Sequence, residues 1–349
     1  MEGNILNIAG LKLLLNESEI PKELLINVIE LTIEEEINLP SLFAIKFNIN
    51  DFLKSEHKGI NLETFTIGDR IKIFMGIDDH IEIMTGEITS LEFSFEKAPV
   101  MEIRGYDRLH RLRFGTMRRS FKNMKDSDIA SMIASEINLS PKVEPTGTIY
   151  PYIFQNNQSN YEFLLERAIR IGYEILNNDK DFIFRKSKEY ESAKIVMEYG
   201  KDFQSFSMHI KALTEGSKVE LRGWDIIGKK EITSTVSKGS ERTKMAGNES
   251  GFEMTENVFN SSTVAILDNM LIDPDDAENI AKARFNLILK EFIIGQGKCK
   301  GNPEIGAGKT IEIKGLGDRI SGVYYIISTV HSIKKGVYNT SFKVRRTGI

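Results

Sequence analysis

Cysteine is almost absent from this 349-residue chain, which has Cys299 alone. A single cysteine cannot form an intrachain disulfide, so the sequence does not require an oxidising compartment. Histidine is scarce as well, and no two histidines are separated by the short spacing of zinc ligands. They are His57, His80, His110, His209 and His331. The sequence therefore predicts no zinc site. We expect His331, on a predicted strand, to be structural and Cys299 to be a small packing residue.

A strong charge of one sign and a long apolar run are also missing. The formal net charge is -4, and 28% of the residues are charged. A charge so nearly balanced gives no general attraction to nucleic acid or to an anionic membrane. No apolar run approaches the roughly 18 residues of a membrane span. The N-terminal MEGNILNIAGLKLLL lacks a basic segment and a cleavage site, so we expect no secretory leader. With 41% hydrophobic residues, the chain can form two or three soluble domains.

The pattern that is present is mainly that of β-strands. Short alternating segments with turn residues between them fill residues 1–115, which predicts a first β-barrel domain. They are LLINVIELTI (24–33), SLFAIKFNIN (41–50), RIKIFMG (70–76), HIEIM (80–84), EITSLEFSFE (87–96) and APVMEIRGY (98–106). The residues Ile77-Asp78-Asp79 predict a hairpin turn.

Residues 116–193 predict a small α/β domain. One helix is expected to have Asp126 or Ser127 as its N-cap and to end before Pro141. A second starts at Ser159, which with Glu162 forms a capping-box pattern, and buries one face made of Tyr161, Leu164, Leu165 and Ala168. Gly172 closes this helix, and residues 173–186 then predict a hairpin.

Residues 194–349 predict a second β-barrel domain with one helix. The helix is expected after Asp273 as N-cap, with Pro274 in its first position. Residues 237–262 predict a long loop. Residues 88–107 and 327–346 share a rhythm of long strand, turn and strand, and residues 67–73 resemble residues 308–315. The fold class expected is therefore α+β, mainly β, with two related β-barrel domains joined by a small α/β domain.

The sequence predicts no catalytic, cofactor-binding or metal site. GAGKT (306–310) is followed by an alternating strand rather than by the helix of a phosphate loop. DPDDAE (273–278) lacks the spacing of an EF-hand loop and is explained by helix capping. No G-x-S-x-G nucleophile motif is present. We therefore expect no enzymatic activity and no cofactor.

A basic segment is the one candidate interface. Arginines gather in residues 104–119, with Tyr106 and Phe114 between them: Arg104, Arg108, Arg111, Arg113, Arg118 and Arg119. Such a segment is typical of a surface that meets phosphate or an acidic partner protein. The alternative is a solvated segment with salt bridges to the many glutamates. Without a net positive charge, nucleic acid is the less favoured partner.

Several segments, in order along the chain, resemble the phage late control D / tail hub family, which also forms the hub segment of VgrG proteins. They are IRGYDRLHRLRFG (103–115), KDSDIASMIASEINL (125–139), QNNQSNYEFLLERAIRIGYE (155–174), VELRGWD (219–225) and CKGNPEIGAGKTIEIKGLGDRISGVYYIISTVHSI (299–333). The resemblance implies a homotrimer whose six barrels join a hexameric tail tube to a trimeric spike. It also implies a structural baseplate hub in a contractile phage-like tail or injection system.

Further expectations follow from this resemblance. Its partners are the tail tube protein, a separate spike protein and other baseplate proteins, with no membrane and with nucleic acid only as channel cargo. Assembly takes place in the bacterial cytoplasm. Many relatives continue into a spike needle, whereas this chain stops at Ile349, so we expect either that the spike is a separate polypeptide or that this sequence is trimmed of it. Two alternatives stay open: a tail-associated peptidoglycan hydrolase and a glycan-binding β protein.

Overall fold

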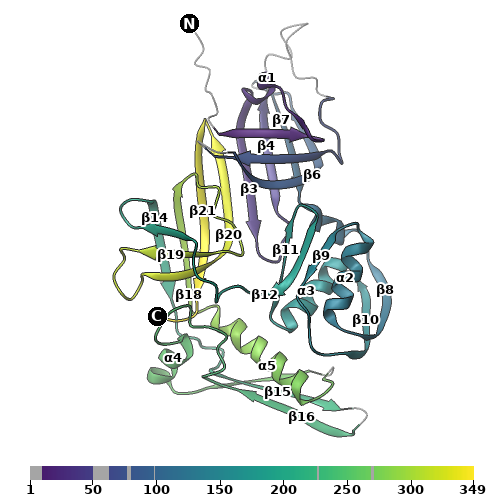
Figure 1. Cartoon of the computed structure of the whole chain (residues 1–349), viewed down its shortest axis with the longest axis vertical. Helices are drawn as coiled ribbons and strands as arrows, with labels where there is room; N and C mark the ends of the chain where they lie inside the picture. Colours follow the sequence, from purple (N-terminus) through teal and green to yellow (C-terminus); the bar gives the residue numbers. More distant parts are fainter. Residues whose placement is uncertain (1–9, 50–62, 77–79, 98, 226–227, 269–270) are drawn as a thin grey trace.

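A computed structural model describes residues 10–49, 63–76, 80–97, 99–225, 228–268 and 271–349. Figure 1 shows two β regions side by side, purple to blue and yellow-green, with a third body of helices and small sheets beside them. Strands dominate the described residues, which confirms the prediction of a mainly β fold with helices. The predicted turn at residues 77–79 lies outside the described residues.

Six strands form the first β region, which we call the first module. In spatial order they are β1 (Leu11–Leu15), β5 (Arg70–Met75), β6 (Ile81–Ser94), β7 (Val100–Tyr106), β4 (Leu42–Asn48) and β3 (Val28–Glu36). All neighbours are antiparallel. Alternate side chains such as Ile71, Ile73 and Met75 are buried in one apolar core, as the period of two in the sequence predicts. The short β2 (Ser18–Glu19) and α1 (Lys22–Leu25) complete the region.

The second β region repeats this arrangement, and we call it the second module. Its strands in spatial order are β13 (Ile195–Glu198), β19 (Thr310–Lys314), β20 (Gly322–Lys334), β21 (Val337–Arg346), β18 (Ile293–Lys300) and β14 (Phe203–Ile210). If the six strands of each module are numbered by their order along the chain, strands with the same number occupy the same position in the two modules. One pairing differs, because β13 runs parallel to β19 whereas β1 runs antiparallel to β5.

The two modules also match in the register of their ladders. Arg70 pairs with Glu87 on β6, as Thr310 pairs with Tyr325 on β20. Two register irregularities recur at corresponding places. The irregularity at Ile88/Ser90 on β6 matches that at Ile326/Ser328 on β20. The irregularity at Val28/Glu30 on β3 matches that at Phe203/Ser205 on β14. β-Bulges are conserved within protein families, so their recurrence at matching positions indicates that the same arrangement of strands occurs twice in this chain.

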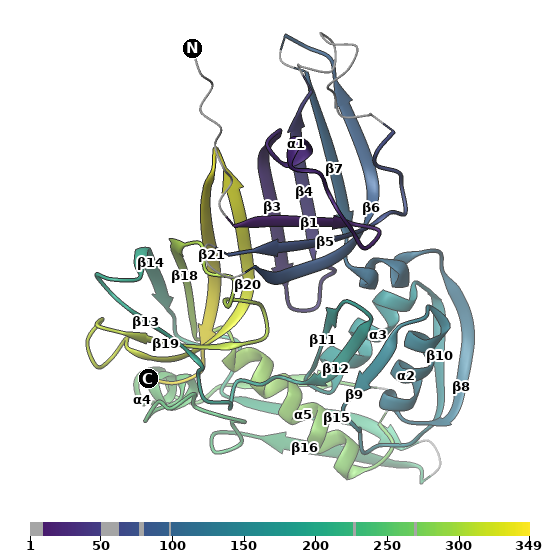
Figure 2. The same ribbon diagram turned by 45° about the horizontal axis from the view of Figure 1, so that its top comes forward.

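The modules are joined edge to edge. β20 pairs with β3 from Ser328–Glu36 to Lys334–Glu30, so both modules belong to one 13-stranded sheet. Figure 2 shows β3 and β20 on facing sides of the two regions. None of the sheets in the described residues closes on itself, so the predicted barrels are open strand sets within this single chain.

The middle region follows β7. It consists of the 3-10 helix η2 (Arg108–Arg113), β8 (Met117–Met124), α2 (Asp126–Glu136), β9 (Ser140–Val143), β10 (Tyr150–Gln158), α3 (Asn160–Arg170), β11 (Tyr173–Asn178) and β12 (Asp181–Lys186). The capping box at the start of α3 is confirmed: Ser159 Oγ accepts from the Glu162 N–H, and the Glu162 carboxylate accepts from the Ser159 N–H. Gly172 has φ +70°, the left-handed conformation expected after the helix.

An insert lies between β14 and β18 of the second module. It contains β15 (Lys218–Asp225), β16 (Lys230–Val236), α4 (Gly251–Phe259), β17 (Thr263–Leu267) and α5 (Pro274–Leu289). Asp273 caps α5 by accepting from the Asp276 N–H, as predicted. The prediction of a continuous loop over 237–262 was wrong, and the region has two helices rather than one. Ser250 and Glu253 form a capping box at the start of α4. The polar composition of residues 237–262 made this helix difficult to recognise from the sequence.

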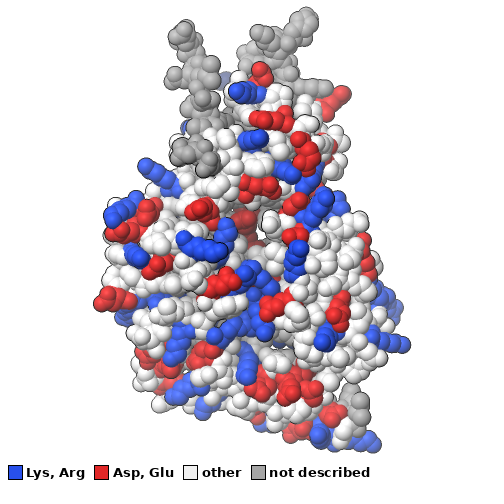
Figure 3. Space-filling model, viewed as in Figure 1, with Lys and Arg blue, Asp and Glu red and all other residues white. Residues whose placement is uncertain are grey.

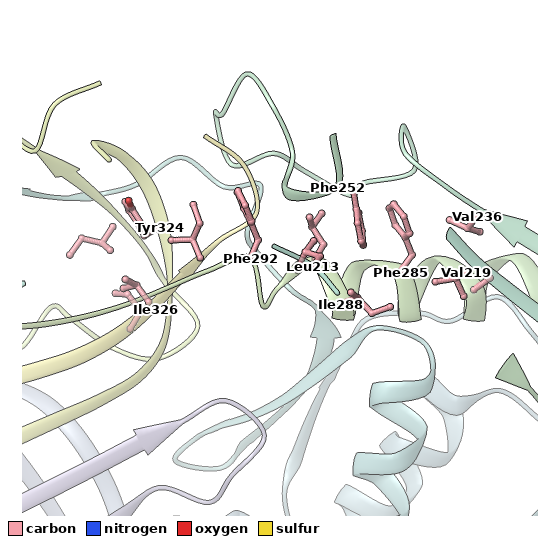
Figure 4. Packing of buried hydrophobic residues seen from close by; sticks show 14 of the residues in the cluster. Leu213, Val219, Val236, Phe252, Phe285, Ile288, Phe292, Tyr324 and Ile326 are labelled. Atoms are coloured by element: carbon pink, nitrogen blue, oxygen red, sulfur yellow. The ribbon is translucent and has the colours of Figure 1, made fainter. Parts of the chain in front are cut away.

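The insert and the second module share one apolar core. Figure 4 shows Phe252 of α4 and Phe285 of α5 facing each other, with Phe292 and Tyr324 continuing the row toward the strands. The rings of Phe252 and Phe285 stack at 4.3 Å between centroids. This continuity holds the insert rigidly on the module.

Two strand predictions need correction. β6 is one strand from Ile81 to Ser94, rather than two strands at 80–84 and 87–96, because Thr85 and Gly86 keep it paired with β5. β3 begins at Val28, rather than at residue 24, because residues 22–25 form α1.

Candidate functional site

The predicted interface arginines lie along one stretch that leaves the first module and enters the middle region. Arg104 is on β7, Arg108, Arg111 and Arg113 are on η2, and Arg118 and Arg119 are on β8. Asp107 fixes the turn between β7 and η2, because its carboxylate accepts from the Ser41 N–H at 2.9 Å and the Leu109 N–H at 2.9 Å. Burial raises the pKa of Asp107 to about 6.

Half of these arginines are bound by carboxylates of the first module. Arg111 makes a two-pronged contact with Glu87, at 2.8 Å and 2.6 Å, and Arg108 approaches the same carboxylate at 3.3 Å. Arg104 pairs with Glu102 at 2.6 Å. The salt-bridge alternative therefore describes these three residues, which share the carboxylates of Glu87 and Glu102.

The remaining arginines contact the middle region or solvent. Arg119 binds both oxygens of Glu136, at 2.7 Å and 2.9 Å, and Arg113 lies over the ring of Tyr161 at 4.6 Å. Arg118 is exposed, and so are the neighbouring Phe114 and Met117. The exposed part of this segment thus combines Arg113 and Arg118 with the apolar side chains of Phe114 and Met117. Its role as a protein interface stays a prediction.

Charges of both signs are mixed on the face that Figure 3 shows. Figure 3 shows basic side chains gathered in the middle of one face, with acidic ones among them. Arg345 contacts Glu189 at 2.6 Å and Arg185 contacts Glu174 at 3.2 Å, both with nearly buried carboxylates. Burial lowers the pKa of Lys290 in this network to about 8. The Arg345–Glu189 pair joins β21 of the second module to the segment after β12, whereas the Arg185–Glu174 pair joins β12 to β11 within the middle region. Neither pair was predicted from the sequence.

The GAGKT turn borders a cavity of about 370 Å³ between the first module, the middle region and β20. Glu35, Asp107, His331 and Lys309 are among its lining residues. Burial raises the pKa of Glu35, which accepts from the Thr329 hydroxyl at 2.8 Å. This is the site in the described residues that most resembles a reaction centre, so the state of its titratable groups matters.

Each of these groups is already engaged by the protein. His331 contacts the Tyr338 hydroxyl through Nδ1 at 2.8 Å and the Ile305 carbonyl through Nε2 at 2.9 Å, and burial lowers its pKa to about 4. Lys309 donates to the Glu304 carbonyl at 2.8 Å. Both ring nitrogens of His331 and the Lys309 ammonium therefore have partners within the chain. Their contacts agree with the structural role expected for His331.

The GAGKT segment itself is a turn that enters a strand. The Gly308 N–H donates to the Ile326 carbonyl at 2.9 Å, and Gly308 has φ +80°. Thr310 then begins β19, which pairs with β13 and β20. A phosphate loop needs a helix whose N-terminus faces the anion, and a strand follows instead.

The other residues singled out by the sequence are structural in the same way. Cys299 is buried, and burial raises the pKa of its thiol to about 11, which keeps it protonated and unreactive. Within the DPDDAE segment, Asp276 is buried and accepts from the Tyr150 hydroxyl at 2.8 Å. In the described part of the chain, histidine, cysteine, aspartate and glutamate form no group of three that could hold a metal ion. No described helix is long and apolar enough to cross a bilayer.

Comparison with known proteins gives one family and one fold. The family model described as the Alg8 N-terminal domain matches residues 6–335. The fold is similar to that of the 43 kDa tail protein of prophage MuSo2 from Shewanella oneidensis, with a TM-score of 0.71, 11% identity, and coverage of 97% of this chain and 98% of the other. No curated protein matches the sequence.

Two further solved structures share the fold. The tail protein from Neisseria meningitidis MC58 has a TM-score of 0.68 at 10% identity, covering 97% of this chain and 96% of the other. The E. coli c3393 protein has a TM-score of 0.60 at 12% identity, covering 92% and 74%. That protein is described as a type VI secretion system component with structural similarity to the T4 tail proteins gp27 and gp5. At these identities the likeness establishes the fold.

Proposed function

This chain belongs to the Alg8 N-terminal domain family, and we propose that it is a structural baseplate hub protein of a contractile phage-like tail or injection system. The observation that carries the proposal is the likeness of nearly the whole chain to tail proteins from two bacteria. The order of segments that resemble the late control D family supports the same conclusion.

The proposed active form is a homotrimer that joins a six-fold tail tube to a three-fold spike. The repeated strand order of the two modules supports it, because three chains then supply six similar strand sets around one axis. In this assembly each module acts as one of two related barrels, and neighbouring chains cover the edges that a single chain leaves open. The insert between β14 and β18 is present in only one module of each chain, so it marks three of the six positions.

The proposed partners are the tail tube protein on the six-fold side, and a separate spike protein and other baseplate proteins on the other side. Assembly in the bacterial cytoplasm, with incorporation into a phage tail or tail-like particle, completes the proposal. We propose no catalytic role, and the internal hydrogen bonds of His331 and Asp107 support this.

Two measurements test the function. Light scattering of the purified chain at micromolar concentration is expected to give the mass of three 39.6 kDa chains, and cryo-electron microscopy of sedimented particles is expected to place the chain where tube and spike meet. A chain that stays monomeric with the tube protein present, or that is absent from the particles, contradicts the proposal. Zymography on peptidoglycan and binding to a glycan array are expected to be negative, and a positive result would favour the hydrolase or the glycan-binding protein.

A further inference from the structure

The second half of β6 has an unpaired edge. Residues Ile81–Glu87 of β6 pair with β5 on that edge, while no described strand pairs with residues 89–94 there. Two aromatic side chains are exposed here, Phe93 on this stretch at 38% and Phe95 directly after the strand at 60%, and their rings stack at 6.5 Å. An exposed apolar strand edge is a site for pairing with another strand.

The second module shows how such an edge is filled. β20 is the counterpart of β6, and its first residues pair with β19 just as β6 pairs with β5. On the same edge, Ser328 to Lys334 pair with Glu36 to Glu30 of β3. The chain therefore contains one complete junction between modules, in which the middle strand of one module receives the last strand of the other.

The counterpart of β3 is β14, and its outer edge is open as well. In the described residues β14 pairs with β18 alone. Figures 1 and 2 place β14 and β6 on opposite sides of the molecule, so they cannot pair within one chain. Along β14, Phe206, Met208 and Ile210 are half-buried against the core, and the residues between them are exposed.

We propose that β6 of one copy pairs antiparallel with β14 of a second copy and repeats the β20–β3 junction between chains. This interface deepens the proposed function, because it gives the trimer its contact. The occupant of the open edge is thus another copy of this chain.

The matched ladders fix the register of this interface. Transferring β20 onto β6 by the shared irregularity aligns Ser328 with Ser90, and transferring β3 onto β14 aligns Glu36 with Lys211. The observed pair Ser328–Glu36 therefore becomes Ser90–Lys211. The pairs expected between the two copies are Ser90–Lys211, Leu91–Ile210, Glu92–His209, Phe93–Met208, Ser94–Ser207 and Phe95–Phe206.

This register sorts the side chains by polarity without any adjustment. Directly opposed residues point to the same face of a sheet. The exposed Phe93 and Phe95 meet the apolar Met208 and Phe206 on one face, and Ser94 meets Ser207 on the other. A slip of one residue would put each phenylalanine opposite a serine or a histidine. The register was derived from the backbone pairing alone, so the agreement of the side chains is a second observation.

Because β6 and β14 are different surfaces, the contact is head-to-tail. Such a contact closes into a ring when the rotation per chain divides a full turn and otherwise forms a filament. Each chain in a ring presents one β6 edge and receives one β14 edge. No edge of this kind then remains open.

Disulfide trapping tests the register. In a Ser94→Cys, Ser207→Cys double variant, the two thiols of neighbouring copies lie directly opposite, at a Cα separation of about 4.5–5.5 Å that a disulfide spans. The native Cys299 is buried and gives little background. Mild oxidation is expected to give covalent dimers and trimers on non-reducing gels, and a mixture of the two single variants is expected to give dimers only.

The matched control is Ser94→Cys with Met208→Cys, which puts the two thiols on opposite faces of the sheet. It is expected to cross-link at least about tenfold more slowly. Equal rates for the two pairs, or no product from Ser94→Cys, Ser207→Cys while the protein is a trimer in solution, overturn the proposed pairing. The latter result leaves the hub function standing.

A second measurement uses charge in place of cross-linking. Phe93→Glu, Phe95→Glu is expected to raise the dissociation constant of the assembly at least about tenfold, because burying one phenylalanine corresponds to an order of magnitude or more. Phe259→Glu alters a phenylalanine on α4 that is 67% exposed, and it is expected to leave the dissociation constant unchanged. Circular dichroism is expected to show all three proteins folded.

The outcomes distinguish a failure of the β6–β14 interface from a failure of the trimeric hub. An unchanged trimer in the Phe93→Glu, Phe95→Glu variant overturns this interface alone. A wild-type chain that is monomeric at all concentrations overturns both the interface and the trimeric hub. Cross-linked open filaments support the pairing and contradict the closed trimer.

Discussion

The ion pair between α2 and α3 gives the sharpest stability prediction. Arg167 donates to both oxygens of Asp126, at 2.6 Å and 3.1 Å, and their side chains are only 6% and 1% exposed. The guanidinium also lies over the Tyr150 ring at 4.5 Å. Replacing Arg167 by Met keeps much of the volume but leaves a buried carboxylate without its partner. We expect a loss of about 3–5 kcal/mol in the free energy of unfolding.

A second variant separates the pair from its packing. Arg167→Met with Asp126→Leu removes both charges, and replacing a buried pair by apolar residues of similar size is often close to neutral. We therefore expect the double variant to recover most of the loss, within about 1–2 kcal/mol of the wild type. The control is Arg222→Met, which breaks a half-exposed pair with Glu220 and should cost no more than about 1 kcal/mol.

Hydrogen exchange measured by mass spectrometry is the suitable assay, because it reports the stability of α3 separately from that of the two modules. Peptides covering residues 160–170 are expected to exchange faster in the Arg167→Met variant by two or more orders of magnitude. A loss below about 1 kcal/mol, or a double variant as unstable as the single one, would refute the reasoning.

Three further predictions follow from buried groups. In the unfolded state His331 takes up a proton below pH 6.5, whereas in the folded state it does so only near its lowered pKa of about 4. The stability contributed by neutral His331 is therefore fully present above pH 6.5 and is lost as the pH falls to 4. The destabilisation by His331→Gln, measured by urea unfolding, should be about 3 kcal/mol smaller at pH 4 than at pH 7, and an equal value at both contradicts this. Phe285→Ala removes a fully buried ring stacked on Phe252 and should cost about 3–5 kcal/mol in urea unfolding, against less than 1 kcal/mol for the exposed Phe259→Ala. Ser159→Ala removes the cap of α3 and should cost about 1 kcal/mol by hydrogen exchange of that helix; no change would mean that the cap is replaced by water.

Features set by neighbouring residues could be predicted from the sequence. The capping box of Ser159 and Glu162 and the cap at Asp273 depend on residues three positions apart, and both are confirmed. The strand-turn-strand rhythm of residues 327–346 likewise appears as the β20–β21 hairpin. Local hydrogen bonding and side-chain periodicity decide these elements, so a short window of sequence is enough.

Features set by distant residues could not be predicted in the same way. Arg111 on η2 is paired with Glu87 on β6, and Arg167 on α3 is paired with Asp126 on α2. The shared strand order of the modules was suggested only by a similar rhythm, because identical ladders can be built from unlike side chains. The helix α4 was missed because it is short, begins at a glycine and lies in an interval rich in glycine, serine and asparagine.

The position of the insert has a consequence for how such proteins diversify. In the first module the strands β3 and β4 are joined by residues 37–41, whereas their counterparts β14 and β18 are separated by residues 211–292. Both connections leave and re-enter the sheet at neighbouring strands, so the added segment changes neither ladder. A lineage can therefore exchange, enlarge or lose the segment as a cassette while the scaffold beneath it stays the same. Fitting a new attachment would require changing one connection and neither strand ladder.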